Sequence, residues 1–560
     1  MDVTPFLELR TAPAIFFDEA KTRGSSPRFM VPEAGAESLT QFRPVSWATI
    51  ATEVRELASY LIGLGIEPTD RGAIFAPNRV EWMSAALAIQ TVGGVMVPVY
   101  PSCTKDQLAY VVSHSDAKVL FVDSEMLLAR VLSTLGALTD VRAVVLLGPV
   151  DRAKAESMVP EAERPSRELI LKVVSLADAK AAGRAGNLAE VERRLAAVTL
   201  DQPGLMLYTS GTSGPPKGVP LTHRNVGVNG SDWLKINGPL LSGEDIDLLW
   251  LPMSHIFGFG EACLGNQLGF VSYLSDPFRV LEHMPMVRPT VFMSVPSHWE
   301  KIATEASGAA TPEEQKQILD RRTGGRLRFC LSGGAGLKQA VKETLHRAGI
   351  LIIEGYGLTE ASPTITLNRP GDFRFDTVGK PLPSVEVRLA EDGEILARGP
   401  NVFAGYHKDP EGTRAVLTDD GWLKTGDIGR FTDDGFLKIV DRKKDILVTA
   451  GGKNVAPANI EIQFKDDPII GHVVVYGDAR KFLVAGVWLH PGAAAAQADV
   501  EGRIAKVNST LASYETIKRF RVFEGSLTIE NGYLTPTMKV KRKKIYEDFG
   551  ARLEALYEKP

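Results

Sequence analysis

The sequence predicts an α/β protein, with a large N-terminal domain of layered sheets, a β-rich subdomain and a small α+β C-terminal domain. The first observation is an apolar stripe at helical spacing, which Ser46 can cap and Gly65 can end, formed by Ile50, Val54, Leu57, Leu61 and Leu64. The second is a series of short β-rich runs that alternate with helical patterns, at residues 73–76, 95–100, 119–122 and 144–147. Strands that alternate with helices are typical of largely parallel sheets covered by helices.

A third observation is a change of pattern after about residue 370. Short strands are separated there by Gly/Asp turns at residues 391–393, 419–421 and 433–435. Such turns favour hairpins and therefore an antiparallel, β-rich subdomain. The four consecutive charged residues Asp441–Lys444 indicate either a solvated hairpin or a domain boundary. A boundary there gives domains at 1–443 and 444–560, while the charged, Ala-rich residues 150–200 are expected to form exposed helices or an insertion.

Composition excludes several classes of protein. Of the 560 residues, 44% are hydrophobic and 24% charged, which is ordinary for a globular protein, and the net charge of −4 does not favour a nucleic-acid binder. Cys103, Cys263 and Cys330 lack metal-ligand spacing, and so few cysteines fit a reducing compartment. The N-terminus has no secretory pattern. The longest uncharged stretch, 83–101, contains Gly93, Gly94 and Pro98 and favours a buried helix followed by a strand over a membrane span.

The clearest chemical motif lies at Thr209–Lys217, where an apolar strand leads into Thr-Ser-Gly-Thr-Ser-Gly-Pro-Pro-Lys. Glycines let backbone N–H groups approach an anion, hydroxyls add donors and the lysine adds positive charge. The spacing differs from that of the common P-loop. A flexible Ser/Gly linker is the alternative, but it would not sit tightly between an apolar strand and a Pro-Lys step. We therefore expect a phosphate-binding loop.

Four further motifs follow along the chain. Residues 354–360 read Glu-Gly-Tyr-Gly-Leu-Thr-Glu and are expected just past a strand, where α/β sheets bind ligands. Tyr356 could present its ring to a base, and Glu360 could hold a hard cation. Asp427, expected at the end of a strand, suits the hydroxyls of a ribose. The last two motifs are the charged segment 441–453 and the segment 534–544, whose basic residues could also be a solvated tail or a nucleic-acid patch.

The order and spacing of these motifs resemble the adenylate-forming (ANL) superfamily, which includes acyl-CoA synthetases, peptide-synthetase adenylation domains and beetle luciferases. The resemblance covers about residues 40–545 and implies a large N-terminal domain followed by a mobile C-terminal domain. It implies ATP, Mg²⁺ and coenzyme A as cofactors and cosubstrate. The implied phosphate loop consists of Thr209, Ser210, Gly211, Thr212, Ser213, Gly214 and Lys217.

The resemblance assigns the other site residues by motif. Gly333, Gly334 and Ala335 would line the adenine pocket, and Tyr356, followed by Gly357, would stack on adenine. Thr359 would contact phosphate, Glu360 would bind magnesium, and Asp427 and Arg442 would bind ribose. Lys444 falls at the hinge position and Gly452 on the hairpin that the pantetheine arm passes. Lys539 matches the lysine that reaches the acid and the α-phosphate. His255 is expected near the acyl-adenylate, although a buried structural histidine fits its sequence context equally well.

The C-terminal motif Thr535-Pro-Thr-Met-Lys-Val-Lys-Arg departs from the usual form, in which Ser-Gly precedes the lysine. It looks like the long-chain fatty acyl-CoA synthetase branch, as do Val97-Pro-Val-Tyr-Pro-Ser102 and Leu367-Asn-Arg-Pro. The leading prediction is therefore a long-chain fatty acid–CoA ligase, with an acyl tunnel near Trp233, 257–261 and 332–336. No insertion of the fatty acyl-AMP ligase kind occurs at 445–460, which favours CoA as the acceptor.

Alternatives stay open at this point. A medium-chain or aryl acid–CoA ligase, an enzyme that loads a carrier protein, and a non-catalytic nucleotide-binding protein fit parts of the same pattern. Nucleic acid is not an expected partner. We expect a cytoplasmic protein, with the inner membrane face as a site of loose association through its fatty substrate and the basic run Lys539–Lys544. The sequence leaves monomer and homodimer open.

Overall fold

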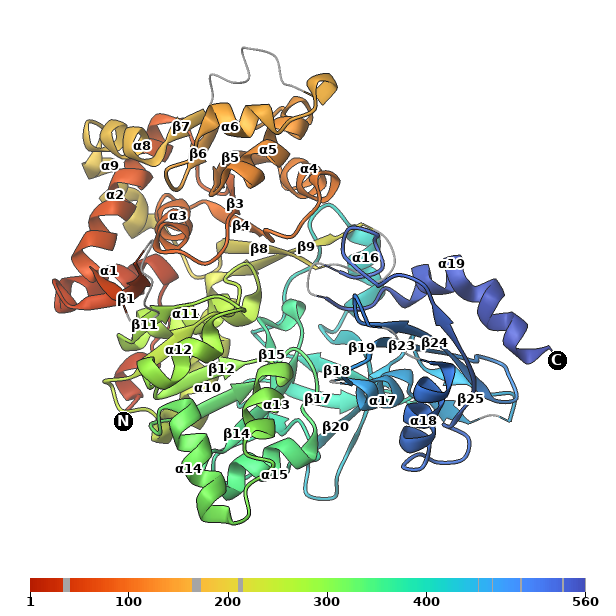
Figure 1. The fold of residues 1–560 in the computed structure, drawn as a ribbon. Coiled ribbons are helices and arrows are strands. Elements are labelled where there is room, and N and C mark those ends of the chain that lie inside the picture. Colours follow the sequence, from red (N-terminus) through yellow and green to blue (C-terminus); the bar gives the residue numbers. More distant parts are fainter. Residues whose placement is uncertain are drawn as a thin grey trace.

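The computed structural model describes residues 1–33, 41–163, 173–209, 215–451, 453–465, 467–493, 496–535 and 538–558. Two large sheets with helices packed between and around them form most of the molecule, and a four-stranded sheet adjoins them (Figure 1). The last part of the chain, blue in Figure 1, forms a smaller lobe on one side. This arrangement confirms the predicted α/β fold class with a β-rich subdomain and a small C-terminal α+β unit.

The first sheet has seven strands in the order β7-β6-β5-β3-β4-β8-β9. All neighbouring strands are parallel except β8 and β9, which form an antiparallel hairpin. The strands are β3 (Arg71–Phe75), β4 (Val95–Val99), β5 (Ala117–Val122), β6 (Ala143–Leu146), β7 (Val173–Ser175), β8 (Pro203–Thr209) and β9 (Lys217–Thr222). The predicted β-rich runs are therefore confirmed as neighbours in one largely parallel sheet.

The predicted amphipathic helix is α2 (Trp47–Gly63). The Ser46 hydroxyl accepts a hydrogen bond from the Thr49 N–H at 3.1 Å, and Gly65 takes a φ of +73°, so the predicted cap and end are confirmed. The uncharged stretch forms α3 (Val80–Thr91) and then β4, as expected. No helix within the described residues is both long and apolar enough to cross a membrane.

Residues 150–200 are only partly what the sequence predicts. The described part forms α6 (Arg152–Ser157), β7, α8 (Leu176–Arg184) and α9 (Leu188–Ala197). Helix α8 is not simply an exposed appendage, because it packs closely on α2. A Cβ added to Gly183 would lie 1.8 Å from the Glu56 carbonyl oxygen, so only glycine permits this approach.

The second sheet has nine strands in the order β16-β15-β14-β13-β12-β10-β11-β1-β2. Its central strands are parallel, and the pairs β16–β15, β15–β14 and β1–β2 are antiparallel. The strands are β1 (Pro27–Pro32), β2 (Phe42–Ser46), β10 (Ile246–Leu249), β11 (Val271–Leu274), β12 (Val291–Ser294), β13 (Phe329–Ser332), β14 (Ile352–Gly357), β15 (Thr364–Leu367) and β16 (Lys380–Pro381).

Helices between the two sheets create the main hydrophobic core, which reaches side chains of both sheets. Helices α4 and α5 cover the other face of the first sheet with a second apolar cluster. The remaining helices of this region are α1 (Ala12–Arg23), α4 (Lys105–His114), α5 (Glu125–Thr134), α10 (His223–Asn237), α11 (Ile256–Leu268), α12 (Val280–Val287), α13 (Pro296–Glu305), α14 (Pro312–Thr323), α15 (Gln339–Arg347) and α16 (Pro410–Val416).

The β-rich subdomain is an antiparallel sheet in the order β17-β18-β19-β20, formed by Glu386–Leu389, Glu394–Arg398, Leu423–Phe431 and Leu437–Arg442. The turns predicted at 391–393 and 433–435 connect its strands. The smaller lobe follows, with β21 (Leu447–Val448), β22 (Asn454–Val455), α17 (Pro457–Glu461), β23 (Ile470–Tyr476), β24 (Leu483–Leu489), α18 (Gln497–Asn508), β25 (Ile517–Phe523) and α19 (Arg542–Glu554). Apolar clusters on both faces of β23–β25 give this lobe its own core.

Candidate active site

The predicted phosphate loop connects β8 to β9 at the tip of their hairpin. Thr209 pairs with Lys217 across the hairpin, so the loop begins and ends at one point. Residues Ser210–Gly214 lie outside the described residues, and their predicted role stays a prediction. The antiparallel pairing fixes Lys217 beside the loop rather than within a helix, unlike the lysine of a P-loop.

Lys217 is held by a segment that belongs to none of the predicted motifs. Its Nζ lies 3.0 Å from Asp409 Oδ2 and 4.5 Å from the centre of the Tyr406 ring. The Gly412 N–H, and then Lys217, hold the pKa of Asp409 below its usual value. The chain is fixed to the hairpin by a hydrogen bond from the His407 N–H to the Gly218 carbonyl at 2.9 Å. Lys217 is therefore positioned by side chains about 190 residues further along the chain.

The motif at 354–360 is predicted to lie just past a strand, and this prediction is wrong for the first four residues of the motif. Glu354–Gly357 belong to β14, which pairs in parallel with β13 up to Glu354 and then antiparallel with β15. Glycines allow this change of partner, because a Cβ on Gly357 would lie 1.8 Å from the Pro363 carbonyl oxygen. Gly357 thus has a structural role in addition to the predicted cofactor contact.

Glu360 and Thr359 lie in a short 3-10 helix directly after this strand. Glu360 is buried, and its Oε1 accepts a hydrogen bond from the Tyr406 hydroxyl at 2.8 Å. Tyr406 therefore contacts both the predicted magnesium ligand and the lysine of the phosphate loop. Within the described residues, no cluster of three or more His, Cys, Asp or Glu side chains forms a preassembled metal site.

Tyr356, Asp427 and Arg442 form one hydrogen-bonded group. The Tyr356 hydroxyl donates to Asp427 Oδ2 at 2.6 Å, and Arg442 Nε lies 2.7 Å from Asp427 Oδ1. Asp427 lies in the middle of β19, not at a strand end as predicted, and pairs across the sheet with Arg442 of β20. Cross-strand pairing, which the local sequence does not encode, therefore brings the predicted ribose-binding pair together.

Gly333, Gly334 and Ala335 follow β13, so this predicted segment does lie at the carboxyl end of a parallel strand. Gly334 has a φ of +84°, which favours glycine. A Cβ on Gly333 would lie 3.0 Å from the Phe257 ring, so this loop passes close to the start of α11.

Lys539 reaches the same region from the smaller lobe. It lies in a tight turn in which the Thr535 N–H donates to the Lys539 carbonyl at 2.8 Å and the Lys539 N–H donates to the Thr535 hydroxyl at 3.0 Å. Its side chain remains exposed, yet partial desolvation, followed by the Arg442 charge, lowers its pKa. Asp427 acts on it in the opposite direction. The predicted lysine is therefore near the Asp427–Arg442 pair in this conformation.

His255 caps α11, since its Nδ1 accepts a hydrogen bond from the Phe257 N–H at 3.1 Å. Burial, and secondarily the Lys539 charge, lowers the pKa of His255 to about 4. The side chain is therefore neutral near pH 7. His255 therefore has the structural role of a helix cap, and its predicted place near the acyl-adenylate stays a prediction.

Lys444 lies in an exposed turn that leaves β20 and leads into the smaller lobe. Lys443 N–H donates to the Gly426 carbonyl at 2.8 Å, and Asp445 N–H donates to the Arg442 carbonyl at 2.9 Å. The turn is thus fixed on both sides of Lys444. Gly452 lies outside the described residues, and its predicted place on the pantetheine path stays a prediction.

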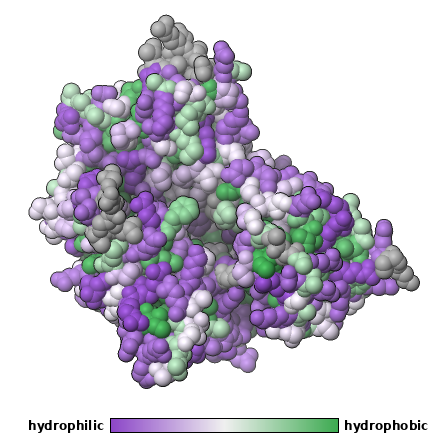
Figure 2. Space-filling model, viewed as in Figure 1, coloured by the Kyte–Doolittle hydropathy of each residue, from purple (hydrophilic) through white to green (hydrophobic). Residues whose placement is uncertain are grey.

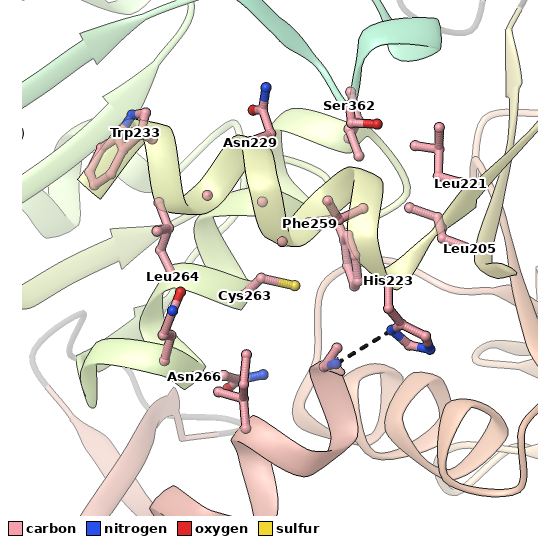
Figure 3. Close-up of a pocket in the computed structure, with 18 of the residues that line it drawn as sticks. Leu205, Leu221, His223, Asn229, Trp233, Phe259, Cys263, Leu264, Asn266 and Ser362 are labelled. Carbon is pink, nitrogen blue, oxygen red and sulfur yellow. Dashed lines mark hydrogen bonds between the residues drawn. The ribbon is translucent and has the colours of Figure 1, made fainter. Parts of the chain in front are cut away.

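A largely apolar pocket extends between α10 and α11 (Figure 3). Trp233 from α10 and Phe259, Cys263 and Leu264 from α11 surround it. The predicted tunnel segments near Trp233 and 257–261 therefore line one cavity, whereas 332–336 do not border it and Leu331 of β13 does. Among the lining residues, Glu261 is buried, and burial raises its pKa well above the usual value.

A family model described as AMP-binding enzyme matches residues 30–407, and a model of the AMP-binding enzyme C-terminal domain matches residues 444–560. The chain belongs to the AMP-binding enzyme family. This membership confirms the resemblance to the adenylate-forming superfamily, whose members use ATP.

Similar curated proteins carry the name long-chain-fatty-acid–CoA ligase. FadD15 of Mycobacterium tuberculosis is 33% identical over 92% of this chain and 92% of that protein. Ligase 5 of Rattus norvegicus is 30% identical over 97% of this chain and 89% of that protein. Among solved structures, the adenylation domain of a carboxylate reductase from Mycobacterium chelonae has a TM-score of 0.82 at 23% identity, with 99% of this chain and 92% of that chain covered. The anthranilate CoA ligase AuaEII has a TM-score of 0.78 at 21% identity, with 98% of both chains covered, and such distant structures show the fold.

His223 at the edge of the pocket gives a prediction about stability and pH. Its Nδ1 accepts from the Ala12 N–H at 3.4 Å, and burial lowers the pKa of His223 from about 6.5 to about 4. In the unfolded chain the ring takes up a proton near pH 6.5, whereas in the folded protein it stays neutral down to about pH 4. The contribution of His223 to the free energy of unfolding is therefore complete above pH 6.5 and is lost as the pH falls toward 4. Because of this side chain, we expect the free energy of unfolding to fall by about 1.4 kcal/mol for each pH unit between pH 6.5 and pH 4.

Urea unfolding of the wild type and of His223→Gln at pH 7, 6 and 5 measures this contribution. Glutamine keeps an acceptor but does not titrate, so the stability gap between the two proteins should narrow as the pH falls. A gap that stays constant from pH 7 to 5 would show that His223 titrates normally.

Proposed function

We propose that this protein is an AMP-forming, ATP-dependent fatty acid–CoA ligase. A carboxylate and ATP give acyl-AMP and pyrophosphate, and acyl-AMP and CoA then give acyl-CoA and AMP. The observation that carries the proposal is the hydrogen-bonded group of Tyr356, Asp427 and Arg442. The charges of Arg442 and Asp427 also reach Lys539. Phe257 lines an apolar pocket and also lies close to Gly333 of the predicted adenine-side loop. The names of the curated relatives support a long-chain acid and CoA as substrates.

In the first step, an anionic carboxylate attacks an anionic α-phosphate, so the site must hold both and spread negative charge. Asp427 and Arg442 would hold the ribose, and Tyr356 would pack against the base. The backbone of Gly333–Ala335 would border the adenine, and Thr359 and Lys217 would face phosphate oxygens. Lys539 would approach the carboxylate and the α-phosphate from the other lobe, where its charge offsets the charge that develops during attack.

The donor set is compatible with a magnesium ion. Glu360 offers a buried carboxylate, and one of its oxygens already accepts from Tyr406, which fixes its orientation. Mg²⁺ usually binds one or two protein carboxylates together with substrate phosphates and water, and it would neutralise phosphate charge here. We assign Glu360 as its protein ligand.

The second step requires CoA to reach the acyl carbonyl. We propose that the chain divides into domains at 1–443 and 444–560 and that rotation about Lys444 withdraws Lys539 and brings the hairpin with Gly452 to the site. The space-filling view is hollowed between the larger part of the molecule and the smaller lobe, which is where such movement would change access (Figure 2). His255, whose pKa burial lowers to about 4, would stay neutral during this step.

A pyrophosphate-release assay with a panel of acids tests the proposal. Long-chain fatty acids with ATP, Mg²⁺ and CoA should give the highest kcat/KM, together with acyl-CoA as the product. Preference for medium-chain or aryl acids would reassign the substrate class. Product formation only when a carrier protein replaces CoA would reassign the acceptor, and the absence of pyrophosphate release with every acid would overturn the proposal.

Tyr406 gives a sharper test of the phosphate end of the site. Tyr406→Phe removes the hydroxyl that donates to Glu360 but retains the ring below Lys217. A hydrogen bond to a charged group is worth about 1.5–3 kcal/mol. We therefore expect the Mg²⁺ concentration needed for half-maximal ATP binding to rise by about tenfold or more.

Equilibrium ATP binding at a series of Mg²⁺ concentrations measures this effect without turnover. Tyr60→Phe, a change of the same kind on the distant helix α2, serves as the matched control. An unchanged Mg²⁺ requirement in Tyr406→Phe would separate Tyr406 from the metal ligand.

A further inference from the structure

The N-terminal segment forms part of the wall of the apolar pocket. Phe6, Leu9 and Ile15 line the pocket together with α10 and α11. The segment is fixed by Gln267 Nε2, which donates to the Phe6 carbonyl at 2.6 Å, and by the Ala12 N–H, which donates to His223. Figure 3 shows this last bond as a dashed line between the start of α1 and the start of α10. The pocket therefore has a wall that is anchored at two points.

The helices on both sides of the pocket carry glycine where they face it. Gly227 and Gly230 lie on α10, and Gly260 lies on α11. A Cβ added at Gly230 or Gly260 would meet nothing within 4 Å, and one added at Gly227 would meet only Leu9, at 3.6 Å. Glycine in a helix costs about 1 kcal/mol relative to alanine. Neither close backbone packing nor a positive φ requires Gly230 or Gly260, so their effect is to leave open volume.

The other end of the pocket lies beside the proposed reaction centre. Phe257 lines the pocket and also lies against Gly333 of the adenine-side loop. Ser362 and Pro363 line it as well, directly after the 3-10 helix that carries Glu360. An acyl chain whose carboxylate lies near Lys539 would thus extend from Phe257 toward Leu9.

We propose that the N-terminal segment at Phe6–Leu9 is the end stop for the acyl chain and that Gly230 and Gly260 set the width along the way. This inference rests on the proposed ligase function. Together, the wall and the glycines determine the longest acid that the enzyme accepts. Each methylene that cannot enter an apolar pocket lowers affinity by about fourfold, so a shift of a few carbons produces a large change in preference.

Gly230→Leu tests the width of the pocket. The added side chain should fill space that the substrate uses, so kcat/KM for the longest accepted acid should fall by about tenfold or more, whereas short acids should change little. Gly502→Leu is the matched control, since Gly502 is an exposed glycine of α18 with open space around it. Saturated acids from eight to twenty carbons supply the series, with acyl-CoA formation as the readout.

Leu9→Ala tests the end stop in the opposite direction. Removing three carbons from the wall should extend the accepted length, so the ratio of kcat/KM for the longest acids to that for the previous optimum should rise by about fourfold or more. Opposite shifts in Gly230→Leu and Leu9→Ala support the inference, and an unchanged chain-length profile in both active variants overturns it. If the wild-type protein showed no ligase activity toward any acid, the proposed function would be overturned instead. The two failures are therefore distinguishable.

Discussion

Replacing Lys539 by alanine is expected to slow acyl-adenylate formation by about a hundredfold or more. The lysine is the cation that the smaller lobe brings to the Asp427–Arg442 pair, and its pKa is lowered by partial desolvation and by Arg442. Removing a donor that acts mainly in the transition state costs about 3–4 kcal/mol, which corresponds to two to three powers of ten in rate. Transfer of the acyl group from preformed acyl-AMP to CoA should remain largely intact, because the role proposed for Lys539 is confined to the first step.

Two separate assays distinguish these half-reactions. ATP–pyrophosphate exchange follows adenylation, and acyl-CoA formation from supplied acyl-AMP follows transfer. Lys543→Ala is a suitable control, since Lys543 belongs to the same basic run but is exposed and faces Glu547 on α19. If Lys539→Ala reduced both half-reactions equally, its assignment to adenylation would be wrong.

Replacing Lys444 by proline is expected to reduce thioester formation by about tenfold or more while adenylation remains within a few-fold of the wild type. In this conformation the charges of Arg442 and Asp427 reach Lys539, which we propose to act in adenylation. A hinge fixed near this conformation would therefore retain the first step. Proline fixes φ and also restricts the preceding residue, Lys443, which pairs with Glu394 at 2.8 Å. Backbone rotation would therefore be hindered at both position 443 and position 444.

Lys444→Ala separates the backbone effect from loss of the charge. Alanine removes the ammonium group but leaves the backbone free, so both half-reactions should remain close to normal. Single-turnover measurements from acid to acyl-AMP and from acyl-AMP to acyl-CoA provide the comparison. Loss of adenylation with normal thioester formation in Lys444→Pro would contradict the assignment of the hinge.

Local features of the chain predict much of the fold. The apolar spacing, cap and terminal glycine of α2 are all local signals, as are the β-rich runs that become β3–β6. Predictions of where a strand ends are wrong at two of the motifs. The strand β14 includes Glu354–Gly357, and Asp427 lies in the middle of β19, because partner strands from later in the chain extend these elements beyond their local apolar runs.

Tyr406 and Asp409 show the limit of motif reasoning at the site. They occur in a short polar turn with a glycine and a proline, a composition shared by many surface loops. Their significance comes from a hydrogen bond that fixes this turn to the β8–β9 hairpin and brings both side chains to Lys217. The same holds for the pocket end wall, because nothing in Phe6–Leu9 indicates that it would lie against α10 and α11.

The sequence by itself determined the fold class, the order of the chemical motifs and their family, because periodicity, turn chemistry and motif spacing are properties of the chain. Only the tertiary structure decided that Tyr356, Asp427 and Arg442 form one group whose charges reach Lys539, and that Glu360 and Lys217 share a contact with Tyr406. The physical reason is that these contacts depend on sheet register and on the docking of the smaller lobe. Both are set by packing over long separations along the chain, which no local pattern specifies.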